Sequence, residues 1–407
     1  MEPTVTTTMI TLPGGTRLRA AAAAMVLAGM ATFAGLLIAG KAELAWSGLL
    51  QGMLVPTWIA MGGLFFIAVH SLCGGAWITP LRRIMEGLTS GLPLTLLGFL
   101  AVAWFGGPYL YDWIFLTGTA HDALFHPHAY SNDLVSPQGW MSAPRWIATT
   151  GVIVVLWLFF RFELVRLSLR QDSGADIARS HVRISTIFLL VFALTFTLFS
   201  WDMLLALNSH WVSTMWGIYC FTSAVQTFIA VLILIVIWLR KGPLEQVVRE
   251  HTLRDLGTWS VAWSCFCAYI GFAQYLVIYY ANMDDETIFF LKRFQHGYGE
   301  SYLLEVALRF LVPFFALMSQ RMRGCPAALV GVSTLVLLGN WIDWSWIIMP
   351  AFSPNLLRPF WDLSTLIIGA GFTGAFLLLA LSFWSKHGLV AKGDPRLHSI
   401  INAEHLH

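Results

Sequence analysis

Long apolar stretches separated by short polar ones dominate this chain of 407 residues. A helix needs about 20 mostly apolar residues to cross the roughly 30 Å of hydrocarbon in a bilayer, because its backbone must satisfy its own hydrogen bonds there. Ten stretches meet this description, with approximate limits 18–40, 53–77, 92–118, 144–164, 183–205, 212–240, 256–281, 301–320, 326–348 and 363–385. The pattern predicts an all-α integral membrane protein with about ten transmembrane helices.

Composition agrees with that fold class and leaves no room for a soluble domain. Apolar residues make up 57% of the chain and charged residues 11%, against about 25% charged residues in soluble domains. We expect an N-terminal tail over 1–17, a ten-helix transmembrane domain over 18–385 and a C-terminal tail over 386–407. The polar N-terminal segment lacks a small-residue cleavage site, so no signal peptide is expected.

Lysine and arginine positions predict the orientation. With the N-terminus inside and ten spans, the outer loops hold Lys41, Arg145, Lys292, Arg293 and Arg358, and Arg309 lies within a span. The other 18 of the 24 basic residues then fall on the inner side. Cytoplasmic loops carry such an excess, so both termini are predicted to be cytoplasmic. Adding or removing one span would reverse the later loops and spoil this asymmetry.

Charged residues within the spans are candidate functional groups, because burying charge in a bilayer costs several kcal/mol. Asp112, Asp202 and Asp343 lie near the outer ends of spans 3, 5 and 9, and Glu305 and Arg309 lie in the outer part of span 8. The last two are four residues apart, so an intrahelical ion pair is the plain interpretation. In the alternative, Glu305 is a protonatable relay group tuned by burial and by Arg309.

Two further polar features, the connection 201–214 and His70, each allow two interpretations. The connection 201–214 contains Asp202, Asn208 and His210, and it either folds back to line a polar cavity or forms an ordinary surface loop. His70 lies in the inner half of span 2, where it either packs between helices or carries a proton or bonds a quinone. The shared depth of the polar residues suggests a hydrated cavity open to the outer face. Its proposed lining is Asp202, His210, Glu305 and Asp343, with Asp112, Asn208 and Arg309 nearby and His70 at the inner end of the same bundle.

No ligand set for a redox cofactor or resident metal is recognisable. None of the five cysteines forms a CxxC or CxxCH motif, and His70 is the one histidine well inside a predicted span, whereas haem b needs facing pairs. A P-loop, a dinucleotide fingerprint and HExxH are all missing. The outer loop 119–143 gathers His121, Asp122, His126 and His128 without a further carboxylate or thiol framework. We therefore expect no firmly bound haem, metal or flavin, and no catalytic residue is assigned. The net charge of +2 gives no reason to expect a nucleic-acid partner.

Several segments share an order with one known family. They are 74–77 and 80–86, 164–172, 202–214, 268–275 with 280–282 and 286–287, and 393–397. This series resembles the F-subunit family of bacterial alternative complex III, a quinol:electron-acceptor oxidoreductase. The most specific segment, 202–214, is similar to a D-x-x-x-x-L-x-P-H-W-x-S-T signature, but Ser209 stands where proline is expected.

The resemblance implies a fold, partners and a role. The F subunit is similar to the membrane anchors of polysulfide reductases, with two four-helix bundles plus two extra helices. It pairs with a homologous membrane protein, the C subunit of the same complex. Both lie in the lipid of the bacterial inner membrane, beneath extracytoplasmic subunits that hold iron–sulfur clusters and haem c. The F subunit would serve respiratory or photosynthetic electron transport by offering a proton half-channel and a contact for a quinone such as menaquinone, without a redox centre of its own.

Two other classes of function compete with this one. A secondary transporter would also have about ten spans and intramembrane charges, but it commonly shows inverted repeats and broken helices near the midplane. Spans 1–5 and 6–10 show no convincing sequence repeat. In the third class, the chain is a structural membrane anchor whose polar residues only specify helix packing.

Overall fold

The computed structural model describes residues 15–114, 140–209, 211–242, 244–245, 247–295, 298–351, 362–394 and 396–397. Within these ranges the chain is helical and contains no β-strand. Eight helical stretches are long and apolar enough to cross a membrane. They are α1 (Gly15–Ile38), α2 (Ala42–Cys73), the segmented stretch Thr79–Leu110, α8 (Ala178–Met203, extended to Leu207), α9 (Trp216–Arg240), α10 (Glu250–Ala281), α15 (Pro326–Ile348, extended to Ala351) and α16 (Leu363–His387). The chain is thus a multi-pass, all-α membrane protein.

Two further helical segments run through the same body. The helix α7 (Ala143–Asp172) has 30 residues, a length of about 45 Å, and it packs along α8. The other consists of α12 (Gly299–Val306), a π-helical turn η6 (Ala307–Leu311) and α13 (Val312–Ala316). It packs between α10 and α15.

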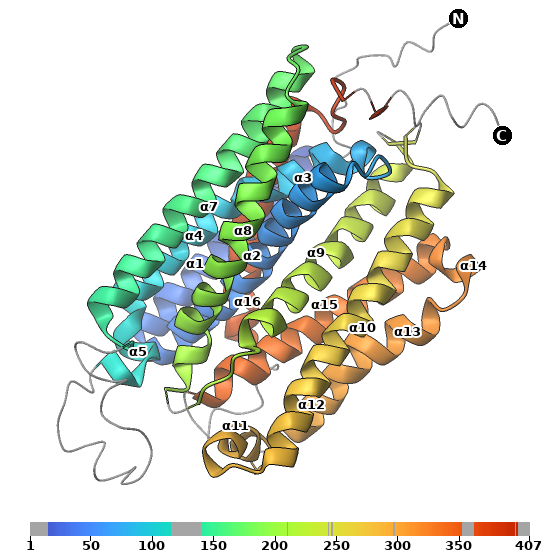
Figure 1. Cartoon of the computed structure of the whole chain (residues 1–407). Helices are drawn as coiled ribbons and strands as arrows, with labels where there is room; N and C mark the ends of the chain where they lie inside the picture. Colours follow the sequence, from blue (N-terminus) through green and yellow to red (C-terminus); the bar gives the residue numbers. More distant parts are fainter. Residues whose placement is uncertain are drawn as a thin grey trace, which may run out of the picture.

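The helices form two groups of four and one pair (Figure 1). The first group contains α2, the stretch Thr79–Leu110, α7 and α8, and the second contains α9, α10, α12–α13 and α15. The helix α9 joins the groups because it packs on α2 as well as on α10 and α15. The pair consists of α1 and α16, and α16 also packs on α2.

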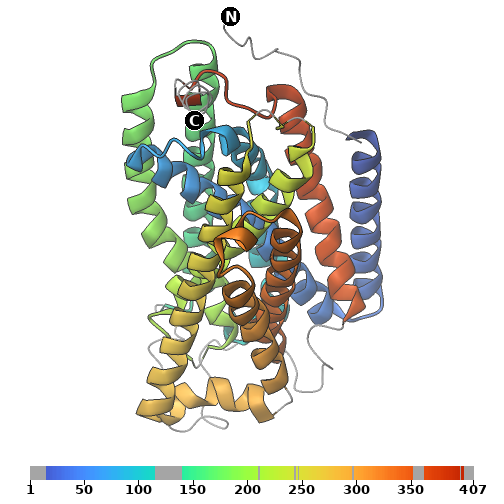
Figure 2. The ribbon, with the colours of Figure 1, turned by 90° about the vertical axis from the view of Figure 1, so that its right-hand side faces the viewer.

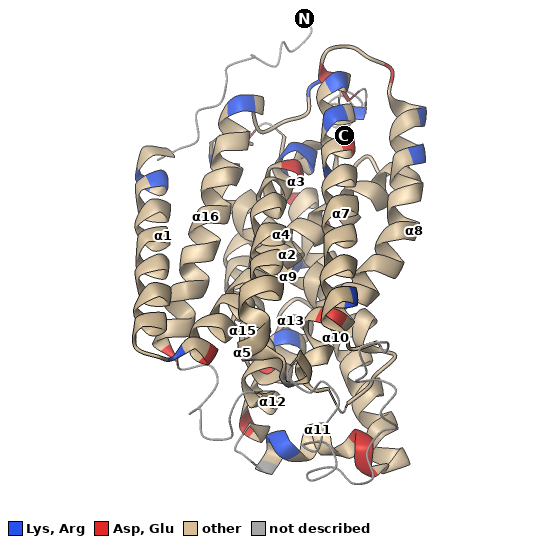
Figure 3. Cartoon of the chain, turned by 90° about the vertical axis from the view of Figure 1, so that its left-hand side faces the viewer, with Lys and Arg blue, Asp and Glu red and all other residues tan. Residues whose placement is uncertain are grey.

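The start of α1 and the end of α16 lie at one end of the molecule, which we call the tail end. At the opposite end, α11 (Asp284–Gln295) lies across the direction of the long helices (Figure 2), and we call it the α11 end. Figure 3 shows charged residues gathered towards both ends, with a few in the body near the α11 end.

Span 2 is longer than predicted. The helix α2 begins at Ala42 rather than at about 53, and its polar residues Ser47 and Gln51 face protein instead of lipid. Gln51 is fully buried and donates a hydrogen bond to Ser345 of α15. Gly52 lies against Gly369 of α16 so closely that an added Cβ would come within 2.5 Å of the Gly369 Cα. Close backbone contact of this kind is how membrane helices gain packing contacts.

Span 3 also differs from its prediction, which placed one span over 92–118 with an interruption at Gly106, Gly107 and Pro108. It begins at Thr79 and is broken into α3 (Arg82–Leu88), α4 (Leu92–Ala101), a π-helical turn η3 (Val102–Gly106) and α5 (Gly107–Leu110). Pro108 causes part of the break, because it has no N–H for the carbonyl of Trp104. The helix start at Thr79 draws Arg82 and Arg83, which the predicted topology assigns to an inner loop, into the folded body, where both are buried.

Candidate functional site

Two carboxylates share one guanidinium in the second helix group, towards the α11 end. Arg309 Nη1 lies 2.6 Å from Glu305 Oε1 and 2.7 Å from Asp343 Oδ2. Glu305 is 5%, Arg309 3% and Asp343 0% exposed. The predicted Glu305–Arg309 ion pair is confirmed, and the fold adds Asp343 from α15. We call these three residues the outer triad.

The other two nitrogens of Arg309 donate to side chains of α9. Nη2 donates to Ser223 Oγ at 2.6 Å, and Nε donates to Gln226 Oε1 at 3.1 Å. Tyr219 donates its hydroxyl to the Asp343 carboxylate. Tyr219, Ser223 and Gln226 follow one another at spacings of four and three, so they lie on one face of α9. The polar network therefore extends from the triad towards the middle of the helix group.

The π-helical turn η6 helps to place Arg309. Pro313 cannot donate a backbone hydrogen bond to the Arg309 carbonyl four residues earlier. Gln226 Nε2 donates to that carbonyl instead, at 2.9 Å. Gly339 of α15 permits the close approach, because an added Cβ would lie 2.8 Å from Arg309 Cγ. π-Turns of this kind are frequent at functional sites.

The outer triad carries an excess of negative charge. Among the described ion pairs, Arg309 is the sole cation that contacts either Glu305 or Asp343. Two buried carboxylates and one guanidinium leave one negative charge without a partner. A group of this kind can hold one exchangeable proton, shared between its carboxylates.

A cavity of about 560 Å³ adjoins the triad. Glu305 and Arg309 form part of its wall, and most of the rest is aromatic or aliphatic. The lining comes from α9, α10, α11, α12–α13 and α15, and includes Trp216, Tyr219, Tyr275, Phe289, Tyr302 and Trp346. The volume lies within the range of small-molecule sites.

Asp202 belongs to a different place in the fold. It lies at the end of α8 in the first helix group, where Arg145 of α7 binds it in a bidentate pair at 2.8 and 3.2 Å. Its backbone carbonyl accepts a hydrogen bond from Trp146 Nε1 at 3.0 Å. Asp202 is buried and does not line the 560 Å³ cavity. Sequence reasoning missed Arg145 as its partner, since it counted this arginine as an outer-loop charge.

His70 and Asn208 also lie apart from the triad. His70 is near the tail end of α2, where its Nδ1 lies 2.8 Å from the Phe66 carbonyl, and its ring packs against Trp77 and Trp259. Asn208 follows the short 3-10 turn Leu205–Leu207, and its backbone N–H bonds the Leu205 carbonyl. Asp112 begins another short turn, Asp112–Ile114, but its side chain lies outside the described residues, as do His210 and the loop histidines His121, His126 and His128.

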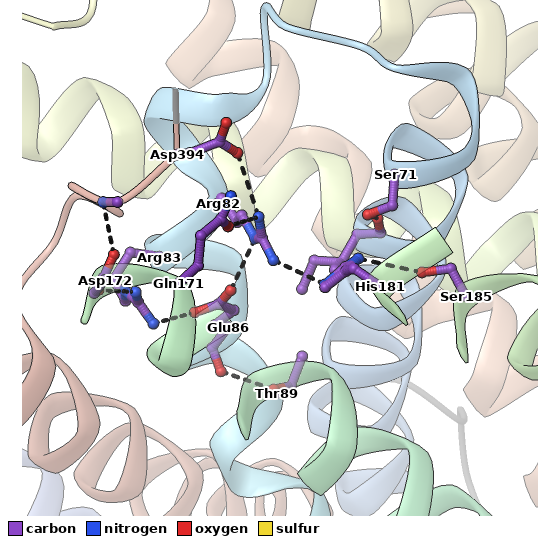
Figure 4. A network of polar contacts seen from close by, with 12 residues as sticks. Ser71, Arg82, Arg83, Glu86, Thr89, Gln171, Asp172, His181, Ser185 and Asp394 are labelled. Atoms are coloured by element: carbon purple, nitrogen blue, oxygen red, sulfur yellow. Dashed lines mark hydrogen bonds and ion pairs between the residues drawn. The ribbon is translucent and has the colours of Figure 1, made fainter. Parts of the chain in front are cut away.

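A second charged network, at the tail end, was not expected from the sequence (Figure 4). Both oxygens of Glu86 are bound, Oε1 by Arg82 Nε at 3.1 Å and Oε2 by Arg83 Nη1 at 2.5 Å. Arg83 also pairs with Asp172 at the end of α7. Arg82 Nη2 lies 2.8 Å from His181 Nε2 at the start of α8. We call these residues, together with the tail residues described next, the inner network.

The C-terminal tail completes the inner network. Arg82 Nη1 donates to Asp394 at 3.3 Å, Arg396 binds the same carboxylate at 2.8 and 3.0 Å, and Asp172 accepts the Gly393 N–H at 2.9 Å. Burial raises the pKa of Asp394, but hydrogen bonds from Arg396 and the charges of Arg396 and Arg82 outweigh burial and hold this pKa below its ordinary value. The network thus holds Gly393, Asp394 and Arg396 against the first helix group.

The described residues show no metal-binding group, and the sequence comparisons found no match. In the described ranges, no three His, Cys, Asp or Glu side chains are grouped so that they could hold a metal ion. No protein-family model matches the chain, and no curated protein matches its sequence.

Proposed function

We propose that this chain is an integral, non-redox subunit of a quinol:electron-acceptor oxidoreductase of the alternative complex III type. It would lie in the bacterial inner membrane beside a homologous membrane partner and beneath extracytoplasmic subunits that hold iron–sulfur clusters and haem c. The ordered series of sequence segments supports this proposal. So does the arrangement of the described helices as two groups of four plus one pair.

The proposal includes ten crossings with both termini in the cytoplasm. The eight long apolar helices, together with α7 and α12–α13, account for that number. The excess of basic residues towards the tail end supports a cytoplasmic position for this end. The α11 end, with the outer triad, would then face the redox subunits.

The chemical role that we assign to the chain is a proton half-channel with a contact for a quinone. The single observation that carries it is the outer triad, two buried carboxylates sharing one guanidinium beside a cavity. Its unpaired charge suits the uptake and release of one proton, and Tyr219, Ser223 and Gln226 continue the polar path inward. Asp202, paired with Arg145, and His70, near the tail end, stand outside this path.

Gentle purification followed by identification of co-purifying chains tests the complex. Subunits with several haem groups and iron–sulfur clusters are expected with this chain. Within the assembled complex, Glu305→Gln should keep the haem content and lose proton release or quinol turnover. The matched control is Glu300→Gln, on the same helix α12 but exposed, which should leave both unchanged. If Glu305→Gln has no effect in an intact complex, the chain is a structural anchor instead.

One observation favours a secondary transporter as the second candidate. The π-turns η3 and η6 interrupt the third and eighth of the ten proposed crossings, and each is followed by a proline, Pro108 or Pro313. These are corresponding positions of two five-helix halves, where transporters place broken helices. Purification as a lone chain, with substrate-driven flux in proteoliposomes, would establish this function over the first.

A further inference from the structure

The cavity beside the outer triad opens through the side of the second helix group. Its lining includes Tyr269 and Phe272 of α10 and Leu303 of α12, which are 65%, 61% and 69% exposed. Apart from Glu305 and Arg309, no described lining residue is charged. Large exposed apolar side chains on a membrane-spanning bundle face lipid, so a ligand would enter from the bilayer rather than from water.

Three residues that line this cavity carry buried hydrogen-bonding groups that lack partners. Glu305 Oε2 is a buried acceptor with no hydrogen-bond partner among the described residues. The indole N–H groups of Trp216 and Trp346 are buried donors that likewise have no hydrogen-bond partner among the described residues. All three side chains line the cavity and are more than nine-tenths buried. A buried group left unpaired loses its hydrogen bonds to water without replacement, so a ligand that supplies the missing partners is favoured.

The chemistry of these three groups specifies a ligand. A hydroxyl group can donate to Glu305 Oε2 and accept from an indole N–H at the same time, whereas a carbonyl or ether oxygen can only accept. The aromatic walls suit a flat ring, which can pack face to face or edge to face against Trp, Tyr and Phe. Each nitrogen of the Arg309 guanidinium already donates within the protein, to Gln226, Ser223 or Glu305, so the ligand is assigned to the three groups that have no partner.

We propose that this cavity binds a membrane-soluble phenol, held by its hydroxyl group at Glu305 and by its ring between the aromatic walls. The proposal deepens the quinone contact of the proposed function and rests on it in one respect: in that complex, the reduced quinol would be the phenol that binds, in preference to the oxidised quinone. Binding itself requires neither turnover nor the partner subunits.

A matched pair of probes tests the hydroxyl requirement. Naphthol and its methyl ether, methoxynaphthalene, share a ring and differ in the ability to donate. Calorimetric titration of the full-length protein in lipid nanodiscs should show naphthol binding about tenfold more tightly, the value of one hydrogen bond to a charged acceptor. Glu305→Gln should reduce that preference. Equal affinity for the two probes overturns the proposal.

A pair of variants tests the location without touching the triad. Ala268 lines the cavity, whereas Ala262 lies on the exposed side of the same helix α10. Ala268→Phe should fill the cavity and weaken naphthol binding at least about tenfold, and Ala262→Phe should not change it. Naphthol binding that survives Ala268→Phe also overturns the proposal.

The outcomes separate this inference from the proposed function. If naphthol binds as expected but no haem or iron–sulfur subunits co-purify, the cavity is a phenol site in a protein of another function. If the complex is isolated and Glu305→Gln stops proton release, yet the two probes bind equally, the half-channel stands and the phenol site fails.

Discussion

The inner network and the outer triad use the same residue types with opposite results. In the inner network, Arg82, Arg83 and Arg396 meet Glu86, Asp172 and Asp394, so three cations balance three anions. In the outer triad, one cation meets two anions. The balanced network joins α3, the end of α7 and the C-terminal tail, whereas the unbalanced triad borders a cavity. Both clusters contain buried charges, so charge balance is what distinguishes the inner network, which holds segments together, from the outer triad, which can exchange a proton.

The largest effect is expected from unbalancing the inner network. Glu86→Gln removes the carboxylate that binds both Arg82 and Arg83, and leaves two buried guanidinium groups with one anion fewer. Removing one partner of a buried ion pair costs about 3–5 kcal/mol. The free energy of unfolding, measured by titration with a denaturing detergent, should fall by that amount.

The matched change in the outer triad should behave differently. Glu305→Gln leaves Arg309 paired one to one with Asp343, so the unfolding free energy should change by less than about 1 kcal/mol. Losses of equal size in Glu86→Gln and Glu305→Gln would contradict the contrast between the two clusters.

The Asp202–Arg145 pair is expected to lie between these two cases. Asp202 is buried, but the Arg145 side chain is 25% exposed, so solvent screens part of its charge. Asp202→Asn should therefore destabilise the protein by about 1–2 kcal/mol. Proton release by the assembled complex should continue, because Asp202 lies outside the proposed path. If Asp202→Asn is stable but loses proton release, Asp202 belongs to the proton path after all.

Acid titration of the tail should give the smallest effect. The pKa of Asp394 is lowered in the folded protein, so its contribution to stability is complete above the ordinary value of 3.8 and is lost only as pH falls through the lower folded value. Limited proteolysis of the C-terminal tail should therefore be unchanged from neutral pH down to that region. Asp394→Asn should expose the tail at neutral pH, and tail release in mild acid would show that another group holds it.

The two clusters also differ in how far the sequence predicted them. Glu305 and Arg309 are four residues apart in one apolar segment, so local helix geometry was enough to pair them. Asp343 lies on another helix, and its arrival depends on Gly339, whose missing side chain lets α15 approach Arg309. The inner network was missed because its arginines sit between apolar segments, where loops are normally solvated. The motif segments 80–86, 164–172 and 393–397 did contain most of its members.

The sequence by itself determined that the chain is an all-helical membrane protein. Segment hydrophobicity is a local property, and a bilayer admits few structures for a backbone that must bond to itself. It also determined which charges are expensive. The tertiary structure alone decided which of them meet, since Arg145 reaches Asp202 and Asp343 reaches Arg309 across helices far apart in the chain. The crossing angle and register of the helices determine these contacts. Both depend on packing between residues far apart in the chain, which no single segment encodes.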